Sequence, residues 1–172
     1  MQKLTHEAIL LRQQKKLKES RLSLCVVLNN IRSLYNVGSI FRTSDGAGIE
    51  KIWICGITGH PPNNQISKTA LGAEDQVQWE YREDAAAVIE ELKQQGYEIV
   101  SLEQTKTSVL YQDFKPSNKV CLVLGNEIEG IEDKVASLSD ESIEIEMSGI
   151  KNSLNVSVAF GIVAYYIKNC MK

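Results

Sequence analysis

Apolar and polar positions along the chain alternate in blocks that predict strands and helices in turn. Short runs rich in β-branched residues predict strands at 22–28, 51–55, 77–81, 97–102, 119–124 and 142–147. Apolar residues spaced three or four apart predict helices at 4–20, 36–47, 83–95 and 154–169. A loop at 60–64 and a short turn near 67–71 separate two of the strands. This alternation is typical of an α/β fold with a mostly parallel sheet flanked by helices.

Two of these segments are apolar on every side. The strand at 119–124 has an unbroken apolar run from Val120 to Leu124 that stops at Gly125, which is typical of a strand covered on both faces. The C-terminal helix has a polar start and is then almost wholly apolar, which indicates a helix that is buried or lies in an interface.

The N-terminal segment is basic although the whole chain is not. The formal net charge of −3 gives no general attraction to nucleic acid, yet residues 7–21 hold five Lys or Arg and two Glu. We predict a helix here with Thr5 as N-cap and with Leu4, Ala8 and Leu11 on one face. This extension, 1–21, either packs on the domain as a solvated helix or docks on RNA or a partner. The candidate RNA-binding residues are Arg12, Lys15, Lys16, Arg21 and, after the first strand, Arg32.

Length and residue usage narrow the class of protein. With 172 residues, 43% of them hydrophobic, the chain is expected to form one domain over 1–172. It shows no signal-peptide pattern and no apolar run of the roughly 20 residues that would span a membrane, so we expect a cytoplasmic protein. Cys25, Cys55 and Cys121 lie in apolar runs and the two histidines, His6 and His60, are far apart, so buried thiols and no metal site are expected.

The first candidate site segment follows the first strand, because ligands of open α/β sheets bind beyond the carboxyl ends of the strands. The sequence NVGSIFRTSD at 36–45 begins a helix at that edge. Asn36 is placed to cap the helix, and Arg42 lies fewer than two turns away. The segment is either part of a ligand site or an N-cap followed by a surface arginine.

The second segment, LGNEIEGI at 124–131, follows the buried strand. Gly125 permits close approach of backbone to a ligand, Asn126 with Glu129 resembles a capping box, and Gly130 suits a tight turn. The segment lacks the Gly-x-x-x-x-Gly-Lys pattern of a phosphate loop, and the glycines at 46 and 48 do not follow a strand as a dinucleotide fingerprint requires. It is either a ligand loop or a well-capped turn from strand to helix.

The third segment, MSGIKNSLNVS at 147–157, gathers polar residues at the start of the apolar C-terminal helix. Lys151, Asn152, Ser153 and Asn155 accompany the free backbone N–H groups of the helix N-terminus, which can bind a small ligand. A capped core helix would also explain the pattern.

Together the three segments resemble the SPOUT superfamily of RNA methyltransferases, in the SpoU or TrmH branch that methylates ribose 2′-hydroxyls. That branch shows an Asn before a helix with Arg-Thr and an acidic residue, then Leu-Val-Leu-Gly-Asn-Glu-x-x-Gly, then Met-x-Gly-x-x-x-Ser-Leu-Asn-Val-Ser. All three occur here in order, and the similarity runs from about residue 22 to the C-terminus. The resemblance implies a C-terminal deep trefoil knot, S-adenosylmethionine as cofactor, a homodimer and an RNA substrate, with tRNA preferred over rRNA.

The resemblance also implies which residues form the site. The cofactor-binding residues would be Leu102, Gly125, Ile145, Met147 and Leu154. The reaction centre would contain Asn36, Arg42, Glu127, Ser153 and Asn155. One departure is Glu146, where the family usually has Pro, so the family's cofactor loop carries over less directly at Ile145 and Met147 than at Gly125.

A role for Arg42 follows from its chemistry. A guanidinium does not ordinarily lose its proton, so we favour a fork onto the adjacent phosphate with electrostatic stabilisation of the developing alkoxide over literal deprotonation. Two other functions remain open. A non-catalytic RNA-binding module would use the basic segment 12–21 without a cofactor, and a flavodoxin-like or other nucleotide-binding α/β enzyme would explain the alternation of strands and helices.

Overall fold

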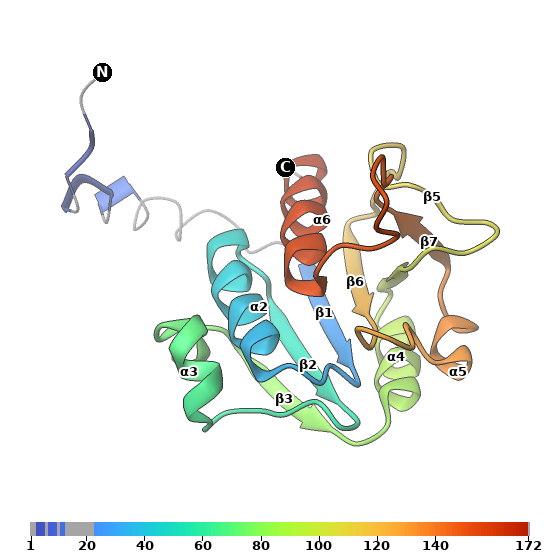
Figure 1. Ribbon diagram of the computed structural model, residues 1–172, viewed down its shortest axis with the longest axis horizontal. Coiled ribbons are helices and arrows are strands. Elements are labelled where there is room, and N and C mark those ends of the chain that lie inside the picture. Colours follow the sequence, from blue (N-terminus) through green and yellow to red (C-terminus); the bar gives the residue numbers. More distant parts are fainter. Residues whose placement is uncertain (1–2, 6, 10, 13–22, 172) are drawn as a thin grey trace.

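The computed structural model describes residues 3–5, 7–9, 11–12 and 23–171. The strands are β1 Ser23–Asn29, β2 Lys51–Cys55, β3 Trp79–Arg82, β4 Glu98–Leu102, β5 Val109–Leu110, β6 Lys119–Leu124 and β7 Glu141–Glu144. The helices are α2 Leu34–Ala47, α3 Asn64–Ala70, α4 Ala85–Gln94, α5 Asp133–Ala136 and α6 Val156–Cys170, with a 3₁₀ turn at Ala73–Asp75. Helices cover both faces of one sheet, as predicted (Figure 1).

The sheet formed by the described strands is parallel throughout, in the order β3-β2-β1-β6-β4-β7-β5. β1 and β6 pair in its centre, from Ser23 opposite Lys119 to Leu28 opposite Leu124. The loops that follow these two strands therefore leave the sheet side by side, although nearly a hundred residues separate them in sequence. This register brings the first and second candidate segments to one edge.

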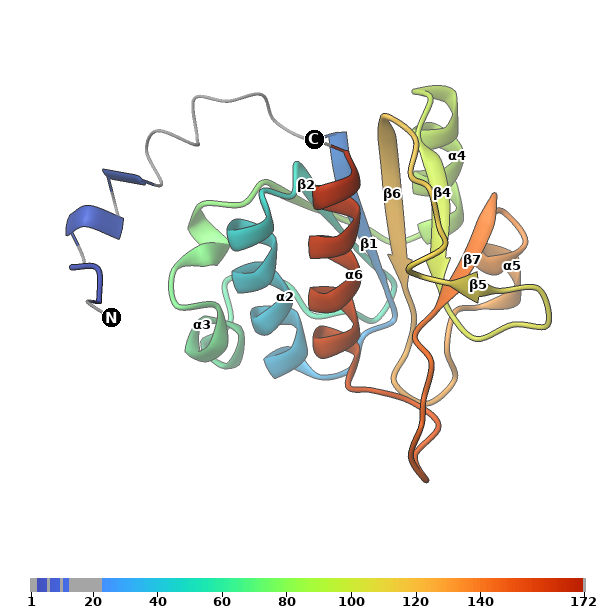
Figure 2. The ribbon, with the colours of Figure 1, turned by 90° about the horizontal axis from the view of Figure 1, so that it is seen from above.

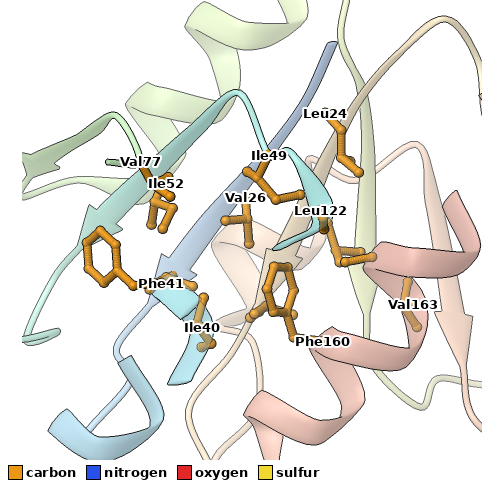
Figure 3. Packing of buried hydrophobic residues seen from close by; sticks show 14 of the residues in the cluster. Leu24, Val26, Ile40, Phe41, Ile49, Ile52, Val77, Leu122, Phe160 and Val163 are labelled. Carbon is orange, nitrogen blue, oxygen red and sulfur yellow. The ribbon is translucent and has the colours of Figure 1, made fainter. Parts of the chain in front are cut away.

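Alternate residues of each central strand supply two cores. Leu24, Val26 and Leu122 pack beneath α2, α3 and α6, where Figure 3 shows Phe160 of α6 and Phe41 of α2 among the buried side chains. The other face packs under α4 and α5, on the opposite side of the sheet in Figure 2. Both faces are thus covered, which is why β6 is apolar without interruption.

Several element boundaries differ from the prediction. The turn expected near 67–71 is the end of α3, which Asn63 caps by accepting a hydrogen bond from Gln65 N–H. The strand expected over 142–147 ends at Glu144, because β7 pairs with β4 through Ile143 and with β5 through Glu144, and no further. Residues 145–155 form an irregular loop before α6. β5 and α5 were not predicted.

The described part of the N-terminal extension agrees with the predicted N-cap and with the start of the predicted helix. Ala8 N–H donates to Thr5 Oγ1 at 3.3 Å, and residues 7–9 and 11–12 are helical. Leu4 and Leu11 are exposed, so these two side chains do not pack on the domain, and docking of the extension on RNA or a partner stays a prediction. Lys15, Lys16 and Arg21 lie outside the described residues, as does the rest of the helix predicted to residue 20.

Three of the four cysteines are buried free thiols, as predicted. Cys25, Cys55 and Cys121 lie on the α4 face, and Cys170 is exposed. Burial raises the pKa of Cys55 to about 12 and that of Cys121 above its usual range, so both thiols stay protonated near neutral pH. No helix among the described residues is long and apolar enough to span a bilayer. The trefoil knot stays a prediction.

Replacement of Phe160 by Ala is expected to lower the free energy of unfolding by about 3–5 kcal/mol, because a fully buried aromatic ring is removed from the packing of α6 against the sheet. Urea unfolding followed by circular dichroism measures this. The matched control is Ile57→Ala, at a side chain 68% exposed, which should change stability by less than about 0.5 kcal/mol. Equal effects from both variants would contradict the role of α6 in the core.

Candidate active site

A cavity of about 570 Å³ opens at the carboxyl ends of β4 and β6, bounded by the loops after β4, β6 and β7. This lies within the range of small-molecule sites. Its lining includes every residue predicted to bind the cofactor, namely Leu102, Gly125, Ile145, Met147 and Leu154. Glu146 in place of proline does not remove its two neighbours from the lining. The third segment and the sheet edge therefore meet at one hollow.

Gly125 lies in the cavity wall where two backbone segments approach closely. The backbone of Asn126 and Gly130 pairs in both directions, N–H to O, at 2.9 and 3.0 Å, which folds residues 125–131 back on themselves. A Cβ added at Gly125 would lie 2.4 Å from the carbonyl carbon of Gly130 and from the nitrogen of Ile131. Only glycine fits this close approach of two backbone segments.

The capping box predicted for Asn126 and Glu129 forms only in half. The side-chain oxygen of Asn126 accepts from the N–H groups of Ile128 and Glu129 at 2.9 and 3.1 Å. The backbone N–H of Asn126 donates to Gly130 O instead of to the Glu129 carboxylate. A two-way bridge thus replaces the start of a helix, and the next helix, α5, begins only at Asp133.

A chain of hydrogen bonds joins the three predicted segments. Asn155 Nδ2 donates to Asn36 Oδ1 at 3.0 Å, and Asn36 Nδ2 donates to Glu127 Oε1 at 2.9 Å. These bonds link residues 119 and 91 positions apart in sequence. Three residues of the predicted reaction centre are therefore in direct contact, beside a cavity that Glu127 and Asn155 also line.

The comparisons with known proteins identify the family. A model of the SpoU rRNA methylase family matches residues 23–165, which include all three segments. The chain belongs to this family. A curated tRNA (guanosine(18)-2′-O)-methyltransferase of Aquifex aeolicus is 30% identical over 165 residues, which cover 96% of this chain and 78% of the relative. The chain spans 61% of a longer TrmH family relative of Staphylococcus epidermidis.

Solved structures of the family have the same fold. The TrmH/SpoU tRNA modifying enzyme of A. aeolicus has a TM-score of 0.83 at 28% identity, covering 95% of this chain and 83% of that one. An AdoMet-bound rRNA methyltransferase from Sinorhizobium meliloti has a TM-score of 0.80 at 26% identity, covering 85% of this chain and 56% of that one. The expected parallel α/β architecture is therefore confirmed by the solved structures as well as by the strand pairing.

Glu127 is the acceptor at the centre of this candidate site. Besides Asn36, it accepts from the backbone N–H groups of Arg32 at 3.0 Å and Ser33 at 3.2 Å. Partial burial opposes ionisation of the carboxyl, but these hydrogen bonds outweigh it and hold the pKa of Glu127 below its ordinary value. The site thus carries a carboxylate at neutral pH.

The helix cap is Ser33, so the prediction that Asn36 caps α2 is wrong. Ser33 Oγ accepts from Asn36 N–H at 3.3 Å, which satisfies the start of the helix three residues earlier. This frees the Asn36 side chain for Glu127 and Asn155. Asn155 does cap α6, accepting from Ser157 N–H at 3.0 Å, and it serves the site with its other amide atom.

Of the remaining predicted residues, some lie at the cavity and others do not. Ser153 lines the cavity. Arg42 is exposed on α2, does not line the cavity and makes no ion pair with any described residue. Arg32 contacts the site through its backbone N–H, which donates to Glu127, and Arg32 is exposed. No group of His, Cys, Asp and Glu suited to a metal occurs in the described part of the chain.

Among the features that sequence reasoning missed are the lining residues Glu103, Gln104 and Glu144 and the cap Ser33. The signal for the first two was their place directly after the strand ending at Leu102, where ligand loops begin.

The lowered pKa of Glu127 predicts how acid affects the site. A folded-state pKa below the unfolded value stabilises the protein at pH values above the unfolded pKa, and this contribution is lost as pH falls through the folded pKa. Glu127→Gln is therefore expected to be less stable than the wild type at pH 7, with the difference shrinking toward pH 3. Urea unfolding at both pH values tests this, and a difference that grows in acid would contradict it.

Proposed function

We propose that the chain is an S-adenosylmethionine-dependent RNA methyltransferase that methylates a ribose 2′-hydroxyl, of tRNA in preference to rRNA. The observation that carries the proposal is the hydrogen-bonded chain of Asn155, Asn36 and Glu127 beside the cavity. Membership of the family supports the reaction class. The printed name of the A. aeolicus relative favours tRNA, while the S. meliloti structure is named as an rRNA enzyme.

The lining and charge of the cavity support the proposed cofactor. The close approach at Gly125 leaves backbone rather than a side chain facing the cavity, and Leu102, Met147 and Leu154 offer apolar surface for an aromatic base. Glu103, Glu127 and Glu144 line it, and none of the described lining residues is Lys, Arg or His. The carboxylates of Glu127 and Glu144 suit a cationic sulfonium, whereas that of Glu103 accepts hydrogen bonds from the backbone N–H groups of Gln104 and Ile131. When bound, S-adenosylmethionine supplies the methyl group.

Different residues around the cavity would orient the ribose, stabilise the developing charge and attract the RNA. Ser153 and Asn155 orient the ribose, and Asn155 is itself held by Asn36, which Glu127 fixes. Arg42, whose guanidinium keeps its proton, forks onto the phosphate next to the target and stabilises the developing alkoxide. Arg12 and Arg32, both exposed, and the basic extension contribute electrostatic attraction to RNA.

We further propose a homodimer through α6. Val158, Ile162 and Tyr165 follow helical spacing on α6 and remain 37–51% exposed in the single chain. A second copy is the partner that the family resemblance implies, and it would cover this stripe with its own.

Val158→Glu is expected to convert the dimer to a monomer, because it places a charge in the apolar stripe. Light scattering after size-exclusion chromatography measures the mass. Ile57→Glu, at an exposed apolar residue of another surface, is the matched control and should leave the mass unchanged. A wild-type monomer at micromolar concentration would refute the dimer.

The whole chain, 1–172, is proposed to act as a single methyltransferase domain with 1–21 as a basic extension, in the cytoplasm, where its RNA would be found. Its chemistry needs no metal, because the electrophile is the methyl group of the cofactor.

The reaction is tested by incubating the protein with methyl-labelled S-adenosylmethionine and total RNA from a strain that lacks its gene. The labelled nucleoside is then identified after digestion. A 2′-O-methylated nucleoside formed by the wild type and lost with Arg42→Ala is the expected result. RNA binding without cofactor binding would favour the non-catalytic RNA module, and co-purified flavin or nicotinamide would favour a different α/β enzyme.

A further inference from the structure

Two consecutive residues after β4 contact both of the other loops that bound the cavity. Glu103 Oε2 accepts from Ile131 N–H at 3.1 Å, at the end of the loop that follows β6. Gln104 Nε2 donates to Asn152 O at 2.8 Å, in the loop between β7 and α6. These partners lie 28 and 48 residues further along the chain. Glu103 and Gln104 also line the cavity themselves.

The contact of Glu103 closes the turn that contains Gly125. Gly130 has a φ of +73°, and a Cβ added there would lie 2.5 Å from Glu103 Oε2. The carboxylate therefore packs directly on the turn as well as accepting from the next N–H. Its other oxygen accepts from Gln104 N–H at 3.1 Å, which orients the carboxylate. Glu103 thus holds the backbone wall that Gly125 and Gly130 form.

The contact of Gln104 holds a loop that has little other support. Within the described residues, its bond to Asn152 O is the only hydrogen bond that joins residues 146–154 to another segment. This loop carries Met147, Ser153 and Leu154, which all line the cavity. Gln104 therefore fixes the distance between the sheet and the loop that carries part of the candidate site.

We propose that Glu103 and Gln104 are positioning residues that hold the two loops at the spacing required to bind S-adenosylmethionine. The role of Glu103 is to accept a hydrogen bond, and that of Gln104 is to donate one. Pre-set loops bind a ligand more tightly because the ligand does not have to order them. The inference rests on the proposed function, since it assumes that the cavity binds this cofactor.

The test is calorimetric titration of purified full-length variants with S-adenosylmethionine. Glu103→Ala is expected to raise the dissociation constant about tenfold, since a hydrogen bond to a charged acceptor is lost, and Gln104→Ala about threefold. Glu103→Gln keeps an acceptor oxygen and should bind within about twofold of the wild type. Lys106→Ala, in the same exposed loop, is the matched control and should also match the wild type.

A second measurement separates positioning from general damage. Amide hydrogen exchange at Ile131 should accelerate in Glu103→Ala but not in Glu103→Gln, while the melting temperatures stay within a few degrees of the wild type. Equal weakening by Gln and Ala at position 103 would overturn the proposal, because it would assign the effect to the charge. Unchanged affinity of Glu103→Ala, with a wild type that binds, would also overturn it. A wild type that does not bind the cofactor would instead refute the proposed function.

Discussion

Gly125→Ala is expected to weaken S-adenosylmethionine binding at least 100-fold. The added methyl group would lie 2.4 Å from backbone atoms of Gly130 and Ile131, and backbone cannot move aside as the end of a flexible side chain can. The 125–131 turn must then open, which disrupts the bridge between Asn126 and Gly130 and moves a wall of the cavity. Overpacking of this kind typically costs about 1–3 kcal/mol of stability as well. Calorimetric titration with the cofactor and thermal unfolding measure the two effects.

The matched control is Gly149→Ala, in the loop after β7. A Cβ at Gly149 meets nothing within 4 Å, so the same chemical change should alter cofactor affinity by less than about twofold. Equal losses in both variants would show that the loops tolerate no added bulk in general. Normal binding by Gly125→Ala would show that the tight turn is not a wall of the cofactor site.

The parts of the fold that the sequence predicts well are those whose burial leaves a long pattern. The run from Val120 to Leu124 is apolar because both sheet faces are covered, and it pairs with β1 along its whole length. β5 has two residues and α5 has four, which is too short for either periodicity to be recognised. Ile145 and Met147 alternate as a strand would, yet no neighbouring strand extends far enough to pair with them.

In the site, as in the fold, local features could be predicted from the sequence but contacts between distant segments could not. The motifs identified many of the residues that surround the cavity, but they could not show which side chains touch. Ser33 and Asn36 are both good helix caps, and local sequence does not decide between them. The choice depends on Glu127, 91 residues away, which binds the Asn36 amide and leaves the cap to Ser33. Such a partner becomes visible only when the register of β1 against β6 is known.

Arg42→Ala is expected to lower the rate of methyl transfer about 100- to 1000-fold while cofactor affinity stays within about twofold of the wild type. The rate should fall because a positioned charge that stabilises a developing oxyanion contributes about this much. The affinity should hold because Arg42 does not line the cavity and has no ion pair among the described residues whose loss would disturb the fold. Single-turnover methylation of RNA, with cofactor affinity measured separately by calorimetry, resolves the two quantities.

Arg42→Lys and Lys68→Ala make the test specific. Lysine keeps the charge but cannot fork onto a phosphate with two parallel hydrogen bonds, so turnover by Arg42→Lys should stay at least tenfold below the wild type. Lys68 is an exposed cation on α3, which packs against α2, and its removal should raise the KM for RNA more than it lowers kcat. Near-normal turnover by Arg42→Lys would contradict the two-hydrogen-bond role of Arg42 and show that it contributes only a positive charge. A loss confined to KM in Arg42→Ala would make Arg42 an RNA-binding residue without a part in the chemical step.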